Sequence, residues 1–263
     1  MILDYDYWYF KSAISPDVCD AIVAQGQAKM KKQEELFGEA VSVATTGGWQ
    51  HKGSDGKEQG AVNDKTIEEL KNQGVDPNSQ YVRDSHITWL DDEPLFDMVQ
   101  TFVKEANTQA GWNFDWDYTE EFQFTKYGPG QFYGWHVDMG SKPYRQFDET
   151  TDKWKLNPDG SSLLDTFGNP MTEDNLATTN PSLFGKVRKL SVTISLNRPE
   201  EYEGGNLKFD FGPHADERFH ECKEIRPQGS VVVFPSHIYH QVTPVTQGTR
   251  YSLVAWNLGY PFR

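Results

Sequence analysis

The sequence predicts a mainly β fold in which helices near the N-terminus support a β-sheet core. Three observations favour this α+β class. Seven or eight short segments alternate apolar and polar residues or form short apolar runs, and turn residues separate them. Helical patterns gather before residue 115, ahead of most of the strands. Residues suited to one site lie on strands far apart in the chain, which favours a closed or two-sheet β architecture.

The first 115 residues are expected to form helices and a few strands that support this core. Ser15 is followed by Pro16 and Asp17. A hydroxyl cap, a proline in the first turn and an acid near the positive end of the helix dipole are typical of a helix start. The expected elements are a strand over 7–10, a helix from Pro16 to about residue 36, a short strand over 40–44, a helix over 64–73, a strand over 81–90 and a helix over 94–107.

The rest of the chain is expected to form the β core. The clearest strand covers 189–197, where apolar residues alternate with serine and threonine. The segment 139–185 is long and polar, and the sequence leaves open whether it covers a site or is a surface insertion. We expect one catalytic domain over 1–263, with a helical support region over 1–115 and a core over 116–263. Further strands are expected over 117–126, around His136, and over 206–211, 231–234 and 249–258.

Composition argues against several functions. Twenty-five basic and 39 acidic residues give a net charge of -14, which disfavours a nucleic-acid partner because phosphates attract basic surfaces. Two cysteines, Cys19 and Cys222, are too few for a disulfide framework and suit a reducing compartment. The first residues lack the regions of a signal peptide, and no apolar run is long enough to cross a bilayer. We therefore expect a cytoplasmic protein without a membrane partner.

Two stretches of the core carry candidate metal ligands. Side chains of an extended strand alternate between its faces, so His136 and Asp138 are expected on the same face. His240 follows the strand over 231–234 and supplies a third ligand from a distant part of the chain. Two imidazoles and one carboxylate are typical of non-haem Fe(II) sites, which leave coordination positions open.

The last predicted strand carries a candidate anion-binding residue. Arg250 shares a face with Ser252, Val254 and Trp256 and lies between hydrophobic residues. A charge in such a strand is costly unless it is paired, and a guanidinium binds a carboxylate through two parallel hydrogen bonds. An ordinary ion pair is the alternative explanation for Arg250.

These stretches together resemble a known family. The motifs are specific in combination, and they cover about half of the chain, roughly 122–258. The pattern resembles the 2-oxoglutarate- and Fe(II)-dependent dioxygenases of the prolyl 4-hydroxylase type. The residues that carry it are Tyr127, the His136-x-Asp138 pair, Glu203-Gly-Gly-Asn-Leu207, Phe234-Pro-Ser, His240-x-Val-x-Pro-Val245, Gly248-x-Arg250-Tyr-Ser-Leu253 and Trp256.

The resemblance implies a fold, cofactors and residue roles. It specifies a double-stranded β-helix, or jelly-roll. It assigns Fe(II) to His136, Asp138 and His240, and the 5-carboxylate of 2-oxoglutarate to Arg250, with Tyr127 and Ser252 as further contacts. The family often has Lys where this chain has Arg250. Oxygen is the other cosubstrate, and ascorbate is a candidate reductant.

The implied substrate is a prolyl residue in a peptide or protein, hydroxylated at C4. Tyr133, Trp256 and Arg83 are candidate substrate contacts or cavity walls. A core position is an equal alternative for Trp256 and Tyr133, and a structural salt bridge is the preferred explanation for Arg83. One alternative keeps the cofactors but changes the substrate to another amino-acid side chain, a free amino acid or a small molecule. Another alternative is a jelly-roll that binds a metal without turnover.

Other histidines compete for the place of the third ligand. His237 lies three residues before His240, and His214 and His220 lie in a polar segment. His240 is preferred because its separation from Arg250 fits the family pattern. His51 and His86 are interpreted as ordinary surface or core residues, and Cys222 as a small buried residue.

Overall fold

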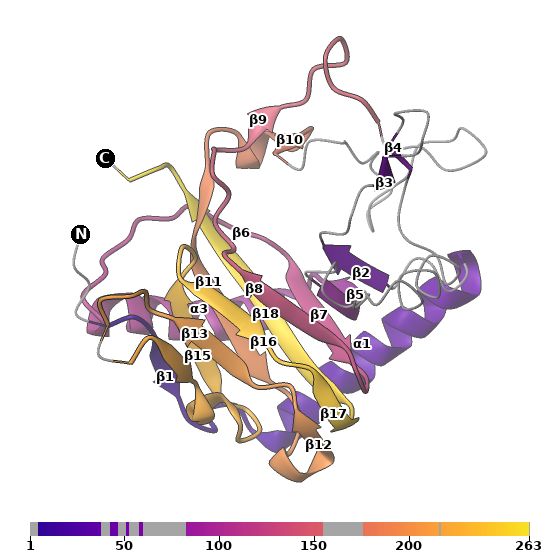
Figure 1. Ribbon diagram of the computed structural model, residues 1–263, viewed down its shortest axis with the longest axis vertical. Helices are drawn as coiled ribbons and strands as arrows, with labels where there is room; N and C mark the ends of the chain where they lie inside the picture. Colours follow the sequence, from indigo (N-terminus) through magenta and orange to yellow (C-terminus); the bar gives the residue numbers. More distant parts are fainter. Residues whose placement is uncertain are drawn as a thin grey trace.

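Strands dominate the computed structural model, which describes residues 5–37, 43–46, 51–52, 58–59, 83–154, 176–215 and 217–262. Figure 1 shows a large curled sheet with α1 (Pro16–Phe37) and α3 (Glu93–Gln109) on one side of it. The predicted mainly β fold with helices packed on one side is confirmed. Among the helices of the described residues, none has the length and apolar character required to span a bilayer.

The main sheet follows one path of neighbouring antiparallel strands. β2 (Val43–Thr46) pairs with β5 and β6 (Tyr118–Thr119) with β18 at its sides. In order, the strands of the path are β1 (Trp8–Phe10), β15 (Val231–Pro235), β11 (Val187–Ser195), β18 (Arg250–Gly259), β7 (Phe122–Tyr127), β5 (Arg83–Leu90), β8 (Phe132–His136), β16 (Tyr239–Val242), β13 (Leu207–Asp210) and β14 (Phe219–Glu221).

Smaller elements lie outside this path. Among the described residues, 3-10 helices cover Pro181–Leu183, Pro199–Glu201 and Lys223–Ile225. Small two-stranded sheets in the same part of the chain pair β12 (Tyr202–Gly204) with β17 (Val245–Gly248), β9 (Arg145–Gln146) with β10 (Ala177–Thr178), and β3 (His51–Lys52) with β4 (Glu58–Gln59).

The sheet folds over so that its two halves enclose a cavity. Strands β7, β11 and β18 form one wall, and β8, β13 and β16 form the opposite wall. This arrangement is the expected double-stranded β-helix. The halves meet between β5 and β8, where Arg83 pairs with Tyr133.

Of three apolar clusters in the described residues, the two larger ones hold the layers together. The larger core joins the helices to the outer face of the sheet through fully buried rings such as Phe122 and Phe124. The smaller core lies around Phe209 and Phe234, between the sheet halves. Burial of each large side chain contributes about 2 kcal/mol, so both cores stabilise the walls of the cavity.

Gly26 explains why α1 can lie so close to the sheet. A Cβ atom at this position would stand 2.4 Å from the Phe124 ring. Glycine in a helix interior costs roughly 1 kcal/mol of helix stability relative to alanine. The close packing on Phe124 offsets that cost, and α1 continues through Gly26 as the sequence predicted.

The predicted elements match the described ones closely in position. The expected strands over 7–10 and 81–90 and the helix over 94–107 correspond to β1, β5 and α3. The strand expected over 40–44 overlaps β2 at 43–44, and residues 40–42 lie outside the described residues, as does the whole helix expected over 64–73. The division at residue 115 stays a prediction, and β1 and β5 from the N-terminal region are strands of the main sheet.

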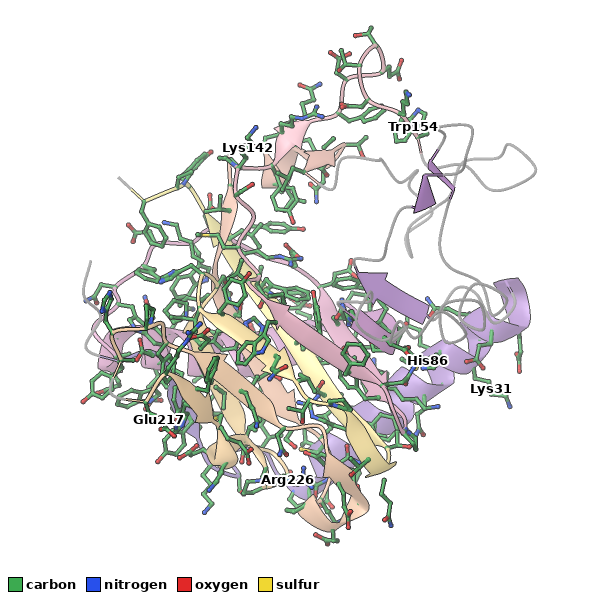
Figure 2. All side chains as sticks on the ribbon, viewed as in Figure 1. Lys31, His86, Lys142, Trp154, Glu217 and Arg226 are labelled. Atoms are coloured by element: carbon green, nitrogen blue, oxygen red, sulfur yellow. The ribbon has the colours of Figure 1, made fainter. Side chains whose placement is uncertain are left out.

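The long polar segment over 139–185 has structure at both of its ends. β9 and β10 come from its two ends and form a parallel pair. Phe147 and Trp154 pack with ring centroids 3.8 Å apart. Figures 1 and 2 place β9 and the labelled Trp154 away from the main sheet. Residues 155–175 lie outside the described residues, so whether the segment covers the site stays a prediction.

Candidate metal centre

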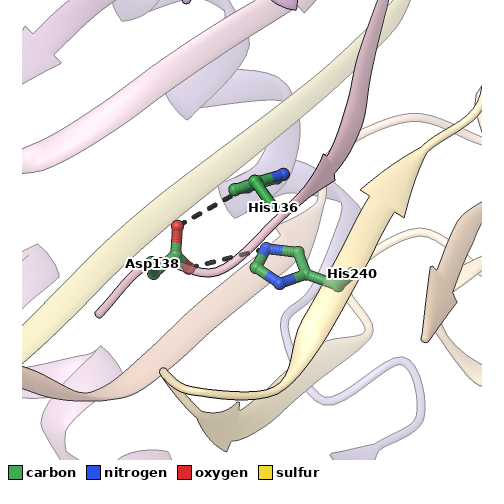
Figure 3. A group of neighbouring side chains, drawn as sticks. All are labelled: His136, Asp138 and His240. Carbon is green, nitrogen blue, oxygen red and sulfur yellow. Dashed lines mark ion pairs between the residues drawn. The ribbon is translucent and has the colours of Figure 1, made fainter. Parts of the chain in front are cut away.

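Three side chains, two from neighbouring strands and one from the bend after β8, converge in the cavity. His136 is the last residue of β8, and His240 lies in β16 directly opposite it in the strand register. Asp138 follows two residues after β8, and its N–H donates to the carbonyl of Ser236. Figure 3 shows the three side chains pointing toward one another. The sequence predicted Asp138 on the same strand as His136, whereas the strand ends at His136 and a bend carries Asp138 to the site.

The distances suit a single divalent ion. Nε2 of His136 lies 3.6 Å from Oδ1 of Asp138, and Nε2 of His240 lies 3.5 Å from Oδ2 of the same carboxylate. One ligand atom from each residue lies within 4.8 Å of the other two. Two imidazoles and one carboxylate at these separations leave one side of an ion open, as in the facial sites of non-haem Fe(II) oxygenases.

Both imidazoles are held in the orientation that a metal requires. Nδ1 of His136 lies 2.7 Å from the carbonyl oxygen of Gly134, and Nδ1 of His240 lies 2.9 Å from that of Ile238. A carbonyl can only accept, so Nδ1 carries the hydrogen and the Nε2 lone pair is directed at the site.

Electrostatics keeps His240 and Asp138 in the protonation states that bind metal. Burial lowers the pKa of His240 to about 4, so its imidazole is neutral at neutral pH. Burial alone would raise the pKa of Asp138, but His240 and His136 outweigh it and hold that pKa far below its ordinary value. At neutral pH His240 therefore offers a neutral imidazole and Asp138 a carboxylate, without a cost of deprotonation.

Two serines that the sequence reasoning missed position the carboxylate. Oγ of Ser191 donates to Oδ2 of Asp138 at 2.7 Å and lies 2.9 Å from Oγ of Ser236. Both serines are fully buried. The signal was present in the sequence, because Ser191 lies on the polar face of the predicted strand over 189–197, but that pattern does not say which group the hydroxyl faces.

The predicted anion-binding residue lies in the same cavity. Arg250 is 3% exposed, and one of its terminal nitrogens donates to Oγ of Ser252 at 3.2 Å. Its guanidinium lies 5.4 Å from the ring centre of Tyr127, its partner in the strand register. Among the described residues, no carboxylate forms an ion pair with Arg250. A buried guanidinium without a counter-charge is costly, so the site suits an anionic ligand.

Glycine gives Arg250 the space that it occupies. Gly205 has a φ of +59°, which favours glycine. A Cβ atom there would stand 2.9 Å from Cδ of Arg250 and 3.0 Å from Cγ2 of Val245. The second glycine of the Glu203-Gly-Gly-Asn-Leu207 pattern therefore leaves room for the Arg250 side chain.

The remaining predicted residues line the cavity, which holds about 450 Å³ of empty space, including its open mouth. The Tyr133 ring stacks on His136 with ring centroids 3.5 Å apart. Trp256 is 4% exposed, and its Nε1 is buried without a hydrogen-bond partner among the described residues. Arg83 also lines the cavity. The sequence reasoning missed Arg188, which packs over Trp256 at 3.8 Å and pairs with Glu120.

The competing histidines lie away from the three converging ligands. His237 is in the exposed turn after β15, and His214 is exposed. His220 contacts Tyr7 and Glu217. The choice of His240 over these rivals agrees with the geometry.

His86 and Cys222 have other environments. Nδ1 of His86 lies 3.3 Å from Oε1 of Gln131, and Cys222 is buried. The side chain of His51 lies outside the described residues.

Together, the fold and the centre are of the kind found in non-haem iron oxygenases built on a double-stranded β-helix. Residues 165–257 match the family model of the 2OG-Fe(II) oxygenase superfamily. The predicted resemblance to 2-oxoglutarate- and Fe(II)-dependent dioxygenases of the prolyl 4-hydroxylase type is confirmed. The matched residues include His240 and Arg250, whereas His136 and Asp138 lie upstream of them.

Relatives of known name also include hydroxylases. A PKHD-type hydroxylase of Delftia acidovorans is 37% identical over 92 residues, which cover 35% of this chain and 37% of that protein. One from Sphingopyxis alaskensis is 32% identical over 126 residues, which cover 48% of this chain and 38% of that protein. The matches therefore span little more than a third of the length of these relatives.

A solved structure shows the same fold at low sequence identity. It is the viral collagen prolyl hydroxylase of Paramecium Bursaria Chlorella virus-1 in complex with 2OG. It is 15% identical, has a TM-score of 0.51, and the match covers 97% of each chain.

Proposed function

We propose that this protein is a dioxygenase that uses Fe(II), 2-oxoglutarate and oxygen to hydroxylate a prolyl residue in a peptide or protein. One observation carries the proposal: a two-histidine, one-carboxylate centre shares a cavity with a buried guanidinium that no described carboxylate neutralises. This donor set suits Fe(II) and leaves room for further ligands. The guanidinium suits the far carboxylate of a dicarboxylic acid.

The residues have distinct roles in this proposal. His136, Asp138 and His240 hold the iron, and Arg250 holds the 5-carboxylate of 2-oxoglutarate with support from Ser252. When bound, iron and 2-oxoglutarate supply the oxidising chemistry, in which oxygen and 2-oxoglutarate give succinate, carbon dioxide and a hydroxylated substrate.

The rest of the cavity orients ligands and excludes water. The Tyr127 ring packs beside Arg250 at 5.4 Å and lines the same cavity. Apolar residues such as Val242, Phe234 and Val254 line the walls. A dry, rigid cavity strengthens the electrostatic contacts to a charged cosubstrate.

The choice of a prolyl substrate rests on the resemblance and on the hydroxylase names of the relatives. Trp256 provides an aromatic surface in the wall of the cavity, which suits a pyrrolidine ring, whereas the Tyr133 ring is stacked on His136 and packs against Arg83. The same cavity would also accept another side chain of similar size, so the substrate must be tested directly. Ascorbate, as a reductant, and a cytoplasmic location both stay predictions.

The test measures succinate formation and substrate mass. Protein prepared without oxygen is loaded with Fe(II) and 2-oxoglutarate, then given oxygen, ascorbate and a panel of proline-containing peptides. We expect succinate release and a peptide heavier by one oxygen atom. Asp138→Ala should abolish both, whereas Asp91→Ala, at an exposed carboxylate that pairs only loosely with Lys29 at 4.0 Å, should keep both.

Two outcomes separate the alternatives. Succinate formation with no modified peptide would keep the cofactors and move the search to other substrates. Bound iron with no succinate under any condition would support a metal-binding module without turnover. Equal activity of Asp138→Ala and the wild type would disprove the ligand assignment.

A further inference from the structure

The cavity contains a second buried guanidinium that the proposed cofactors do not use. Arg83 lies in β5, is 6% exposed and lines the same cavity as Arg250. β5 and β8 meet at this residue, where Arg83 is paired with Tyr133. The guanidinium therefore lies in the wall beside the metal centre.

Only neutral groups of the described residues contact Arg83. Its Nε donates to Oγ of Ser85 at 2.8 Å, and its Nη2 donates to Oε1 of Gln123 at 2.6 Å. The guanidinium carbon lies 4.7 Å from the ring centre of Tyr133. Among the described residues, no carboxylate pairs with Arg83 and no acceptor contacts its Nη1. Part of its hydrogen-bonding capacity is therefore left for a ligand.

A contrast within the same protein shows that this arrangement is specific. The partly buried Arg188 is neutralised by Glu120, through bonds of 2.9 and 2.5 Å. Arg83 and Arg250 are more deeply buried and lack such a partner among the described residues. Since buried charges are ordinarily paired, two unpaired guanidiniums in one cavity indicate two anionic ligand groups.

The charges in the cavity indicate the charge of the ligand group that would neutralise it. Among the described residues that line the cavity, Arg83 and Arg250 contribute two positive charges and Asp138 one negative charge. Fe(II) and doubly ionised 2-oxoglutarate cancel each other. The loaded cavity would therefore keep one positive charge, which a substrate with one carboxylate would neutralise.

We infer that Arg83 binds a carboxylate of the substrate beside the carbon that is oxidised. This inference rests on the proposed function and narrows its substrate class to acids. The carboxylate comes either from the main-chain terminus of the prolyl substrate or from an acidic side chain next to the proline. In both cases Nη1 of Arg83 supplies the free donor, while Ser85 and Gln123 hold the guanidinium in place.

A purely structural role for Arg83 gives a different expectation. The Tyr133 ring lies between Arg83 and the His136 ring, on which it stacks. If Arg83 only held this stack in place, its loss would weaken metal binding. It would also weaken the binding of acidic and neutral substrates by the same factor. A substrate carboxylate on Arg83 instead requires discrimination between an acid and its amide.

The test compares acid and amide probes on loaded protein that cannot turn over. Protein with Mn(II) and 2-oxoglutarate is titrated by calorimetry with two matched pairs. One pair is N-acetyl-L-proline and its amide, and the other is acetyl-Pro-Asp-amide and acetyl-Pro-Asn-amide. We expect the acid of one pair to bind about tenfold more tightly than its amide or better. The pair that shows the preference identifies the source of the carboxylate.

Variants assign the preference to a residue. In Arg83→Gln the acid and the amide should bind equally, and Arg83→Lys should keep part of the preference. Arg198→Gln, at an exposed arginine on the surface, should keep all of it. Titration of 2-oxoglutarate into each protein shows separately whether the proposed cosubstrate site is intact.

The inference is overturned by any of three results obtained with 2-oxoglutarate bound. These are equal binding of acid and amide in both pairs by the wild type, no binding of any probe, or a preference that survives Arg83→Gln. The wild-type comparison needs no variant, so it decides the matter even if Arg83→Gln fails to fold. Failure of the wild type to bind 2-oxoglutarate would count against the proposed function instead.

Discussion

Replacing Arg250 by methionine should stabilise the ligand-free protein while weakening its cosubstrate site. Arg250 is 3% exposed, with one hydrogen bond of 3.2 Å and no described carboxylate partner. Methionine has a similar length and fills most of the same space, so the change removes a buried charge without leaving a large cavity. We expect a gain of about 1–3 kcal/mol in the free energy of unfolding. This corresponds to a rise of about 2–6 °C in Tm for a chain of this size.

Arg188→Met is the matched control, and it should have the opposite sign. Arg188 forms two hydrogen bonds to Glu120, whose side chain is 13% exposed. Removing the guanidinium leaves that carboxylate with little solvent and no cation, and we expect a loss of roughly 3 kcal/mol. The opposite signs follow mainly from the ion pair, because Arg188 has a carboxylate partner in Glu120 and Arg250 has none among the described residues.

Thermal unfolding with and without 2-oxoglutarate measures both effects. With Mn(II) present, a saturating cosubstrate should raise the Tm of the wild type and of Arg188→Met by mass action. Arg250→Met should show little response, because losing the charge-assisted contact weakens binding by about 2 kcal/mol or more, roughly thirtyfold. A fall in Tm for ligand-free Arg250→Met as large as that of Arg188→Met would refute the reasoning, since it would mean that the Arg250 charge is already compensated.

Further predictions concern the metal ligands, the packing of α1 and the thiols. Ser191→Ala should weaken Mn(II) binding about 10- to 100-fold, because it removes the hydroxyl that donates to the Asp138 carboxylate. Ser195→Ala is the control and should leave the Mn(II) affinity unchanged, because the Ser195 hydroxyl has no partner among the described residues. In metal-free protein, the pKa of His240 lies at about 4, below that of the unfolded chain. The unfolded state therefore binds more protons between about pH 4 and 6.5, and the free energy of unfolding should rise with pH across that window. Chemical denaturation at a series of pH values measures this rise, which should be smaller in His240→Gln. Gly26→Ala should lower the free energy of unfolding by about 1–3 kcal/mol despite the better helix propensity, because its Cβ would overlap an aromatic ring; an increase would show that the helix shifts freely. Burial raises the pKa of Cys222 to about 12, so native protein at pH 8 should resist alkylation at this thiol and lose that resistance in denaturant, as followed by intact mass.

Most of the fold could be predicted from local patterns in the sequence. The helix start at Ser15 and Pro16 and the alternation over 189–197 depend on short-range preferences of the backbone and on burial of one face. For that reason, α1 and β11 begin and end close to the predicted residues. The convergence of His136, Asp138 and His240 could be predicted because each lies in a short motif that resembles the family pattern.

The sequence by itself determined which residue types were available: two imidazoles, a carboxylate and a guanidinium, in motifs that resemble one oxygenase family. Only the tertiary structure decided how they meet. The strand register places His240 opposite His136, a bend and a serine hydroxyl place the Asp138 carboxylate between them, and the folded sheet leaves Arg83 and Arg250 unpaired in one cavity. These relations arise from contacts between strands far apart in the chain. Spacing along the chain does not encode them, because their geometry depends on how the sheet closes and what it buries.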